Sequence, residues 1–293
     1  MRRSSVLWLI AIVVTLGSAV WQRATGPTYP RRVRAEVGGL AVSGKLPRSG
    51  IVHEPVAISL EAAPQLGGEI RWRRFPTDDP WQTAPLRRAG DRLVGELPAQ
   101  TAPAAKVEYA VWIFDTAGDS ALFPVTARFK GAVPLPVVVV HVAAMFLGML
   151  FSLRAGLEAL AHGPGLRRQV AATLVCLGAG GLLLGPVVQK YAFDAYWTGW
   201  PVGEDLTDNK LALAVLFWAV AAWRLRRDHT AWTVVASAVT FVVFMIPHSL
   251  HGSTHDWETG GQIQTRLELR QDPLASPPLA ASIAGEVTGR AGT

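Results

Sequence analysis

The run VPLPVVVVHVAAMFLGMLFSL, residues 133–153, decides the fold because the chain changes character on either side of it. It contains no charged residue and is long enough for a helix that crosses a bilayer, which takes about 20 residues. Pro134 and Pro136 suit the first turn of such a helix, where a missing N–H costs little. Short alternating segments precede this run, and further apolar runs follow it. We therefore expect an ectodomain before residue 133 and a membrane domain after it.

The composition agrees with a membrane protein. Half of the 293 residues are hydrophobic and 17% are charged, against about 25% charged in soluble domains. The net charge of +6 is explained by arginines that flank apolar runs. No stretch interleaves basic with aromatic residues, so nucleic acid is not an expected partner. The single cysteine, Cys176, lies in an apolar run and excludes a disulfide framework.

Five apolar stretches predict membrane-spanning helices, which makes the lipid bilayer the first expected partner. They cover residues 6–21, 133–153, 170–188, 211–223 and 231–246. The first follows two arginines and is typical of a signal peptide or an uncleaved signal anchor; we expect the anchor, over residues 1–22. The other four have short connections and predict a four-helix bundle over residues 133–256. Residues 257–293, rich in Ala, Gly, Pro and Ser, predict a flexible tail.

Arginines predict the orientation of these helices. Those that flank the apolar runs would all lie on one side of the membrane: Arg2, Arg3, Arg167, Arg168, Arg224, Arg226 and Arg227. Positively charged residues are enriched in cytoplasmic loops. We therefore expect a cytoplasmic N-terminus in the inner membrane of a bacterium. Residues 23–132, the loop 189–209 and the C-terminus would then be periplasmic.

The ectodomain, residues 23–132, reads as a β-sandwich. Seven short segments alternate with Gly- and Pro-rich turns: residues 35–42, 56–61, 68–75, 81–87, 92–97, 106–114 and 121–129. Alternation is clearest at 106–114, where Val107, Tyr109, Val111 and Ile113 share one face. The stretch LPAQTAPAAKVEYAVWIFDTAGDSALFP, residues 97–124, resembles the later strands of fibronectin type III-like and immunoglobulin-like bacterial modules. That resemblance implies a fold and no activity.

The loop KYAFDAYWTGWPVGEDLTDNK, residues 190–210, is rich in aromatic rings and carboxylates. Tyr196, Trp197 and Trp200 are expected at the outer membrane interface, which such amphipathic rings prefer. The acids and lysines of the loop would face a partner or the sandwich. Thr207 or Asp208 is expected to cap the following helix.

Two glycines in the third apolar run predict a helix contact. Gly181 and Gly185 form a GxxxG pair, and bare backbone at that spacing lets another helix approach closely. We interpret the pair as a contact face whose partner is unknown.

Histidines give the sharpest hint of a cofactor. His141 and His248 would lie at the same depth near the outer ends of their helices. Two facing imidazoles suit a b-type haem, and a bacteriochlorophyll magnesium needs one; in the simpler alternative, His141 forms a hydrogen bond within the bundle. The run HSLHGSTHDWE matches no zinc spacing. Glu158 is expected to snorkel to the interface or to pair with Arg154 or Arg167, although a role in proton transfer stays open.

Two resemblances bear on function. GPVVQKYAFDAYWTGWPVGEDLTDNK followed by MIPHSLHG resembles a family of uncharacterised bacterial multipass membrane proteins over most of residues 136–253, and this brings no chemistry with it. The overall plan resembles an accessory subunit of a bacterial photosynthetic reaction-centre–antenna complex. No nucleophile elbow, phosphate loop or dinucleotide fingerprint is present.

These observations lead to one main hypothesis and one alternative. The main hypothesis is a non-enzymatic subunit that braces other integral membrane subunits of a bioenergetic complex. The alternative is an electron-transfer protein that holds haem b between His141 and His248. A transporter or a sensor is disfavoured because no span carries a central charge or a break into two halves.

Overall fold

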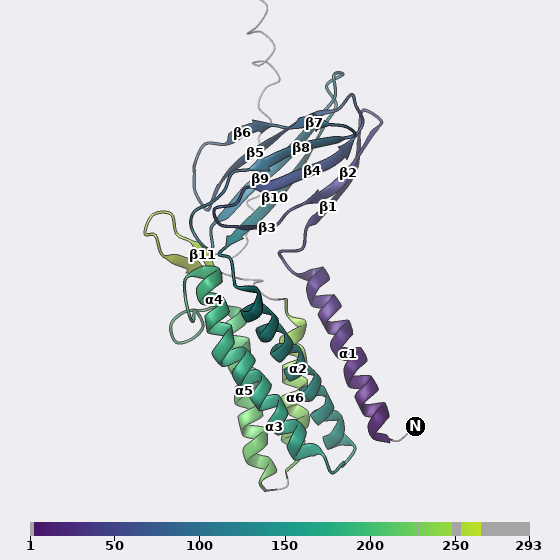
Figure 1. The fold of residues 1–293 in the computed structure, drawn as a ribbon, viewed down its shortest axis with the longest axis vertical. Coiled ribbons are helices and arrows are strands. Elements are labelled where there is room, and N and C mark those ends of the chain that lie inside the picture. Colours follow the sequence, from purple (N-terminus) through teal and green to yellow (C-terminus); the bar gives the residue numbers. More distant parts are fainter. Residues whose placement is uncertain (1–2, 228, 248–252, 265–293) are drawn as a thin grey trace, which may run out of the picture.

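The computed structural model describes residues 3–227, 229–247 and 253–264. The protein is α+β: two five-stranded sheets stand at one end of a set of long apolar helices (Figure 1). The first helix leads into the sheets, and the sheets lead back into the remaining helices.

The two sheets are built from ten strands in residues 31–130. The strands are β1 (Arg31–Val37), β2 (Leu40–Leu46), β3 (Ser49–Ile51), β4 (Val56–Ala62), β5 (Gly67–Phe75), β6 (Gln82–Pro85), β7 (Arg87–Ala89), β8 (Arg92–Leu97), β9 (Lys106–Phe114) and β10 (Ser120–Lys130). One sheet has the order β1-β2-β4-β8-β7 and the other β3-β10-β9-β5-β6. Strands pair antiparallel except β3, which runs parallel to β10.

The core of this domain lies between the sheets, as period-two alternation requires. Val107, Tyr109, Val111 and Ile113 are all buried, which confirms their predicted common face. The hydroxyl of Tyr109 donates a hydrogen bond of 2.7 Å to the carbonyl of Pro47, so this buried polar group is satisfied.

Two of the predicted strands differ in the structure. The prediction of one strand over residues 35–42 was wrong, because Gly38 and Gly39 have φ values of 56° and 74° and form the turn of a hairpin between β1 and β2. Positive φ is accessible to glycine without the steric cost that other residues meet. The segment 81–87 divides at Leu86 into β6 and β7, which belong to different sheets.

The helices are α1 (Arg3–Thr25), α2 (Leu135–Leu160), α3 (Leu166–Cys176), a π-helical segment η1 (Leu177–Leu184), α4 (Gly185–Phe193), α5 (Leu206–Leu225) and α6 (Ala231–Met245). Four helices are long and apolar enough to cross a membrane: Arg3–Thr25, Leu135–Leu160, Leu166–Phe193 and Leu206–Leu225. The fifth predicted span, α6, has 15 residues and is about 22 Å long at 1.5 Å per residue.

The helix Leu166–Phe193 changes its winding in the middle. Pro186 lacks an N–H, and its ring displaces the carbonyl of the preceding turn. This accounts for the widened π segment that ends just before it, at Leu184. Such single π segments occur often at functional sites.

A buried ion pair connects the helices at the ends that lie away from the sheets. Arg154 and Glu158, one turn apart on α2, form a salt bridge, and both side chains are almost fully buried. Glu158 also accepts a hydrogen bond of 3.0 Å from the N–H of Gly165, and the Arg154 guanidinium lies 5.3 Å from the ring centre of Trp8 on α1. The predicted pairing of Glu158 with Arg154 is confirmed, and the pair also connects α2 with α1 and with the turn before α3.

Residues 253–264 differ from the flexible tail expected from residue 257. They contain the hairpin of β11 (Ser253–His255) and β12 (Gln262–Gln264), which lies beside the sandwich (Figure 1). Trp257 attaches this hairpin to the sandwich. Its indole N–H donates a hydrogen bond to the carbonyl of Phe75 at 3.4 Å, and the Arg74 guanidinium stacks over its ring at 4.8 Å. Residues 265–293 of the predicted tail lie outside the described residues.

Candidate functional site

The loop 194–205 is held against the start of α5 by two side chains. Asp208 Oδ2 accepts hydrogen bonds from the backbone N–H groups of Thr198 at 2.7 Å and Gly199 at 3.0 Å. Asn209 Oδ1 accepts from the N–H of Trp200 at 2.6 Å. The loop is therefore a fixed part of the bundle rather than a free connection.

Asp205 caps α5, and the prediction of Thr207 or Asp208 as the cap was wrong. Asp205 Oδ1 accepts hydrogen bonds from the N–H of Thr207 at 2.7 Å and from the N–H of Asp208 at 3.4 Å. A carboxylate at this position also interacts favourably with the positive end of the helix dipole. Because Asp205 takes this role, the Asp208 side chain is available to hold the loop.

The aromatic residues of the loop fall into two groups. Trp200 is 78% exposed and Tyr196 60% exposed, as a surface that faces lipid or a partner requires. Trp197 is half-buried and donates from its indole N–H to the carbonyl of Trp200 at 3.1 Å, so it stabilises the turn. Lys190 forms an ion pair of 2.6 Å with Asp194, beside the ring of Tyr196.

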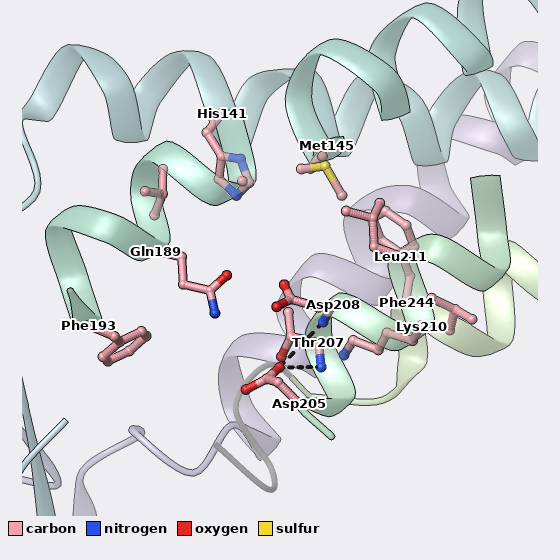
Figure 2. Close-up of a pocket in the computed structure, with 14 residues that line it drawn as sticks. His141, Met145, Gln189, Phe193, Asp205, Thr207, Asp208, Lys210, Leu211 and Phe244 are labelled. Atoms are coloured by element: carbon pink, nitrogen blue, oxygen red, sulfur yellow. Dashed lines mark hydrogen bonds between the residues drawn. The ribbon is translucent and has the colours of Figure 1, made fainter. Parts of the chain in front are cut away.

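A cavity of about 150 Å³ lies beneath this loop, among α2, α4, α5 and α6 (Figure 2). Six polar residues line it: His141, Gln189, Asp205, Thr207, Asp208 and Lys210. The other lining residues are apolar: Met145, Gly181, Gly185, Val188, Phe193, Leu211, Val243 and Phe244. In Figure 2, His141 lies on one side of the space, and Asp205 and Asp208 lie on the other.

His141 is held by the π segment. Its Nδ1 lies 2.8 Å from the carbonyl oxygen of Gly180. A carbonyl only accepts, so Nδ1 carries the proton of this hydrogen bond, and in the corresponding neutral tautomer the lone pair lies on Nε2. The hydrogen bond within the bundle, one of the two interpretations of His141, is thus present.

Of the two expected ligands of a haem, His141 lines this cavity and His248 lies outside the described residues. The pairing of His141 with His248 around a haem or a bacteriochlorophyll therefore stays a prediction.

Lys210 and Gln189 are both used within the chain. Lys210 is 6% exposed and donates from Nζ to the carbonyls of Ile246 at 2.8 Å and Pro247 at 3.5 Å, which completes the end of α6. With its amide in the better of two orientations, Gln189 donates to Asp208 and to the Tyr196 carbonyl, and accepts from the Thr198 hydroxyl. Lys210 therefore holds the end of α6, and Gln189 holds the loop.

The predicted glycine pair lines the cavity. A Cβ on Gly181 would lie 2.5 Å from Leu211 Cδ1, so this glycine permits the close packing of η1 on α5. A Cβ on Gly185 would lie 3.9 Å from His141 Cε1, in ordinary contact. The helix that Gly181 contacts thus belongs to the same chain.

A second polar centre joins the sandwich to the bundle. Arg128 on β10 stacks over the ring of Phe193 at 4.0 Å and donates to Ser253 Oγ at 3.1 Å. The residue is partly exposed, but its Nε is enclosed and has no hydrogen-bond partner among the described residues. Burial lowers the pKa of Arg128 to about 10, and Asp205 opposes this shift. Backbone bonds support the joint, from Gly131 N–H to the carbonyl of Ala192 at 2.8 Å and from His255 N–H to that of Ala104 at 3.1 Å.

Sequence reasoning identified His141 and the glycine pair of the cavity, but it missed the contacts of Asp205, Asp208 and Gln189 and the joint at Arg128. Arg128 occurs on a strand where charge normally indicates a solvated face. Asp205, Asp208 and Gln189 were read as a polar loop, although acids within two residues of a helix start are a known signal for capping. Within the described part of the chain, no group of three His, Cys, Asp or Glu residues could hold a metal ion.

The comparisons add nothing to this geometry. No family model, curated protein or solved structure matches the chain. The function must therefore follow from the cavity, the loop and the joint between the domains.

Proposed function

We propose that this chain is a non-enzymatic accessory subunit of a bacterial membrane bioenergetic complex, with a photosynthetic reaction-centre–light-harvesting complex as the favoured assembly. Its bundle packs beside larger integral membrane subunits, and its outer domain braces them in the periplasm. The observation that carries the proposal is the fixed joint between the sandwich and the bundle.

The joint supports bracing because it has several independent contacts. Arg128 reaches both α4 and β11. The connection from β10 to α2 is short, residues 131–134, and is itself bonded to α4 through Gly131. The hairpin β11–β12 adds a third attachment. A domain held in this way transmits force to its partners, whereas a domain on a flexible linker does not.

The orientation is part of the proposal. The hairpin that follows α6 contacts the sandwich, which supports an even number of crossings between β10 and β11. Together with the arginine distribution, this supports a cytoplasmic N-terminus and a periplasmic sandwich in the bacterial inner membrane. The two packed sheets support an immunoglobulin- or fibronectin-like assignment of the outer domain.

Exposed apolar side chains supply the surface for lipid and partners. On α1, Val13, Leu16 and Val20 are each at least 59% exposed, and on the helix Leu166–Phe193 Leu183 is 70% exposed. Trp200 and Tyr196 extend this surface to the loop. The bundle therefore presents apolar sides to its surroundings at the level of the membrane and aromatic rings at its outer edge.

The test is purification from native membranes in mild detergent. We expect a large particle that contains other integral membrane proteins and bacteriochlorophyll. Arg128→Gln should loosen the joint and reduce recovery of the particle several-fold, whereas Arg87→Gln, an exposed arginine on β7, should leave it unchanged. Recovery of the wild-type chain alone, as a colourless monomer, would exclude the accessory role.

The alternative, a b-type haem electron-transfer protein that uses His141 and His248, has one supporting observation. With the proton on Nδ1, the neutral tautomer of His141 carries on Nε2 a lone pair that can accept a hydrogen bond or bind a metal. A reduced-minus-oxidised spectrum decides between the two: a Soret band that disappears in His141→Ala would establish the haem protein.

A further inference from the structure

The cavity beneath the loop has a chemistry that a bracing role does not use. We propose that it binds a single aromatic ring with hydroxyl groups, the head of a membrane quinol, which donates hydrogen bonds to His141 on one side and to the Asp205–Asp208 side on the other. The proposal concerns binding only, and it does not depend on the accessory role.

Two polar atoms that face the cavity are acceptors without a hydrogen-bond donor among the described residues. With Nδ1 of His141 donating to Gly180, the neutral tautomer carries its lone pair on Nε2. Asp205 is 6% exposed, and its Oδ2 accepts no hydrogen bond within the described residues, since Oδ1 alone caps α5. Lys210 Nζ donates to the end of α6, and Gln189 donates to the loop. A ligand that satisfies both His141 and Asp205 must therefore donate hydrogen bonds.

The need for a hydrogen-bond donor favours some classes of ligand and disfavours others. A lipid phosphate or a fatty-acid carboxylate brings only acceptors and negative charge to a site that already holds two carboxylates. A quinone also brings only acceptors. A cation is opposed by Lys210 in the lining and by Arg128, which interacts with Asp205. A neutral hydroxyl group donates without adding charge, so a quinol or a related phenol fits best.

The size and the walls agree with one ring. The cavity of about 150 Å³ equals the volume of an engineered protein cavity that takes up benzene. Met145, Val188, Leu211 and Phe244 line it, and apolar walls with few polar groups are typical of small-molecule sites. In Figure 2 the polar groups lie on opposite sides of the space, as the two hydroxyls of a para-substituted ring require.

The first experiment measures binding to the full chain purified in detergent. The probe is a hydroquinone with a decyl tail, kept reduced, and binding is followed by isothermal titration calorimetry. The controls are its dimethyl ether, which lacks both donors, and the corresponding quinone. We expect one saturable site for the hydroquinone and at least tenfold weaker binding of both controls. Equal affinity for the hydroquinone and its dimethyl ether would overturn the proposal.

Variants locate the site. Because one hydrogen bond contributes about 1 kcal/mol, His141→Phe should weaken binding of the hydroquinone about threefold to tenfold. Asp205→Asn keeps a good capping residue and should weaken binding about threefold or more. Leu216→Met, a matched change on the exposed side of α5 away from the cavity, should stay within twofold of the wild type. Unchanged affinity in both polar variants would refute the site, and if His141→Phe does not fold, Asp205→Asn and the ether comparison still decide.

A probe without a tail distinguishes the sources of such a ring. If hydroquinone without a tail binds as tightly as the decyl compound, the natural ligand is a soluble phenol. If hydroquinone binds at least tenfold more weakly than the decyl compound, the natural ligand is a lipid-soluble quinol whose tail contributes to binding. Both outcomes support recognition of a hydroxylated ring, and no detectable binding of either probe would overturn it.

Discussion

Replacing Asp208 by alanine removes the carboxylate that holds the loop 194–205 to α5. Its Oδ2 accepts two backbone hydrogen bonds, from Thr198 at 2.7 Å and Gly199 at 3.0 Å. Hydrogen bonds to a charged group contribute about 1.5–3 kcal/mol each. When the loop opens, water forms hydrogen bonds with the freed groups and compensates part of the loss. We therefore expect the free energy of local opening to fall by about 3 kcal/mol.

Hydrogen exchange of the backbone amides measures this change directly. A loss of about 3 kcal/mol corresponds to roughly a hundredfold faster exchange, and it should appear at Thr198 and Gly199 while the amides of β9 stay protected. Asp194→Asn is the matched control, because its ion pair with Lys190 is exposed and solvent screens such surface pairs. Exchange at Thr198 and Gly199 that is as slow in Asp208→Ala as in the control would refute the role assigned to Asp208.

Three further predictions concern buried polar groups. Glu158→Gln leaves the charge of Arg154 buried and unpaired, so we expect a loss of about 3–5 kcal/mol, measured by denaturant unfolding in detergent; the double variant with Arg154→Met should recover most of it, and no recovery would contradict the pairing. Burial lowers the pKa of Lys106 to about 8 from 10.5; the unfolded chain therefore binds more protons between these values, and stability should rise as pH increases from about 8 to about 10.5. This rise should be absent in Lys106→Met, and an identical pH profile of the melting temperature in the two proteins would contradict it. Tyr109→Phe removes the hydroxyl that donates to Pro47, and we expect a melting temperature lower by the equivalent of about 1 kcal/mol; an unchanged melting temperature would show that the bond adds no stability.

The sequence predicts this fold well where a pattern repeats along the chain. The apolar runs identified the helices because bilayer thickness sets their length. The alternation at 106–114 identified β9 because one face of a strand must be buried. The prediction failed at 35–42 because the Gly38-Gly39 pair was passed over, although two glycines between alternating segments are a known signal for a tight hairpin turn.

The candidate site could be predicted only in part, for a different reason. His141 stood out because a histidine inside an apolar run is rare. Its partner, the carbonyl of Gly180, arises from the π segment before Pro186, which no side-chain pattern announces. The cavity joins His141, Gln189 and Asp208 from three helices, and Arg128 meets Phe193 across two domains. Contacts between residues so distant in sequence depend on helix packing, which single-sequence patterns do not contain.

The hairpin β11–β12 gives the chain an order of completion. Ribosomal synthesis supplies the sandwich first and the hairpin after the last helix, because β11 follows α6. The bond from His255 to Ala104 and the contact of Trp257 with Phe75 therefore form only after all the preceding helices have been synthesised. These contacts join the segment made last to the sandwich made first, so a helix out of place would also keep the hairpin from its partners.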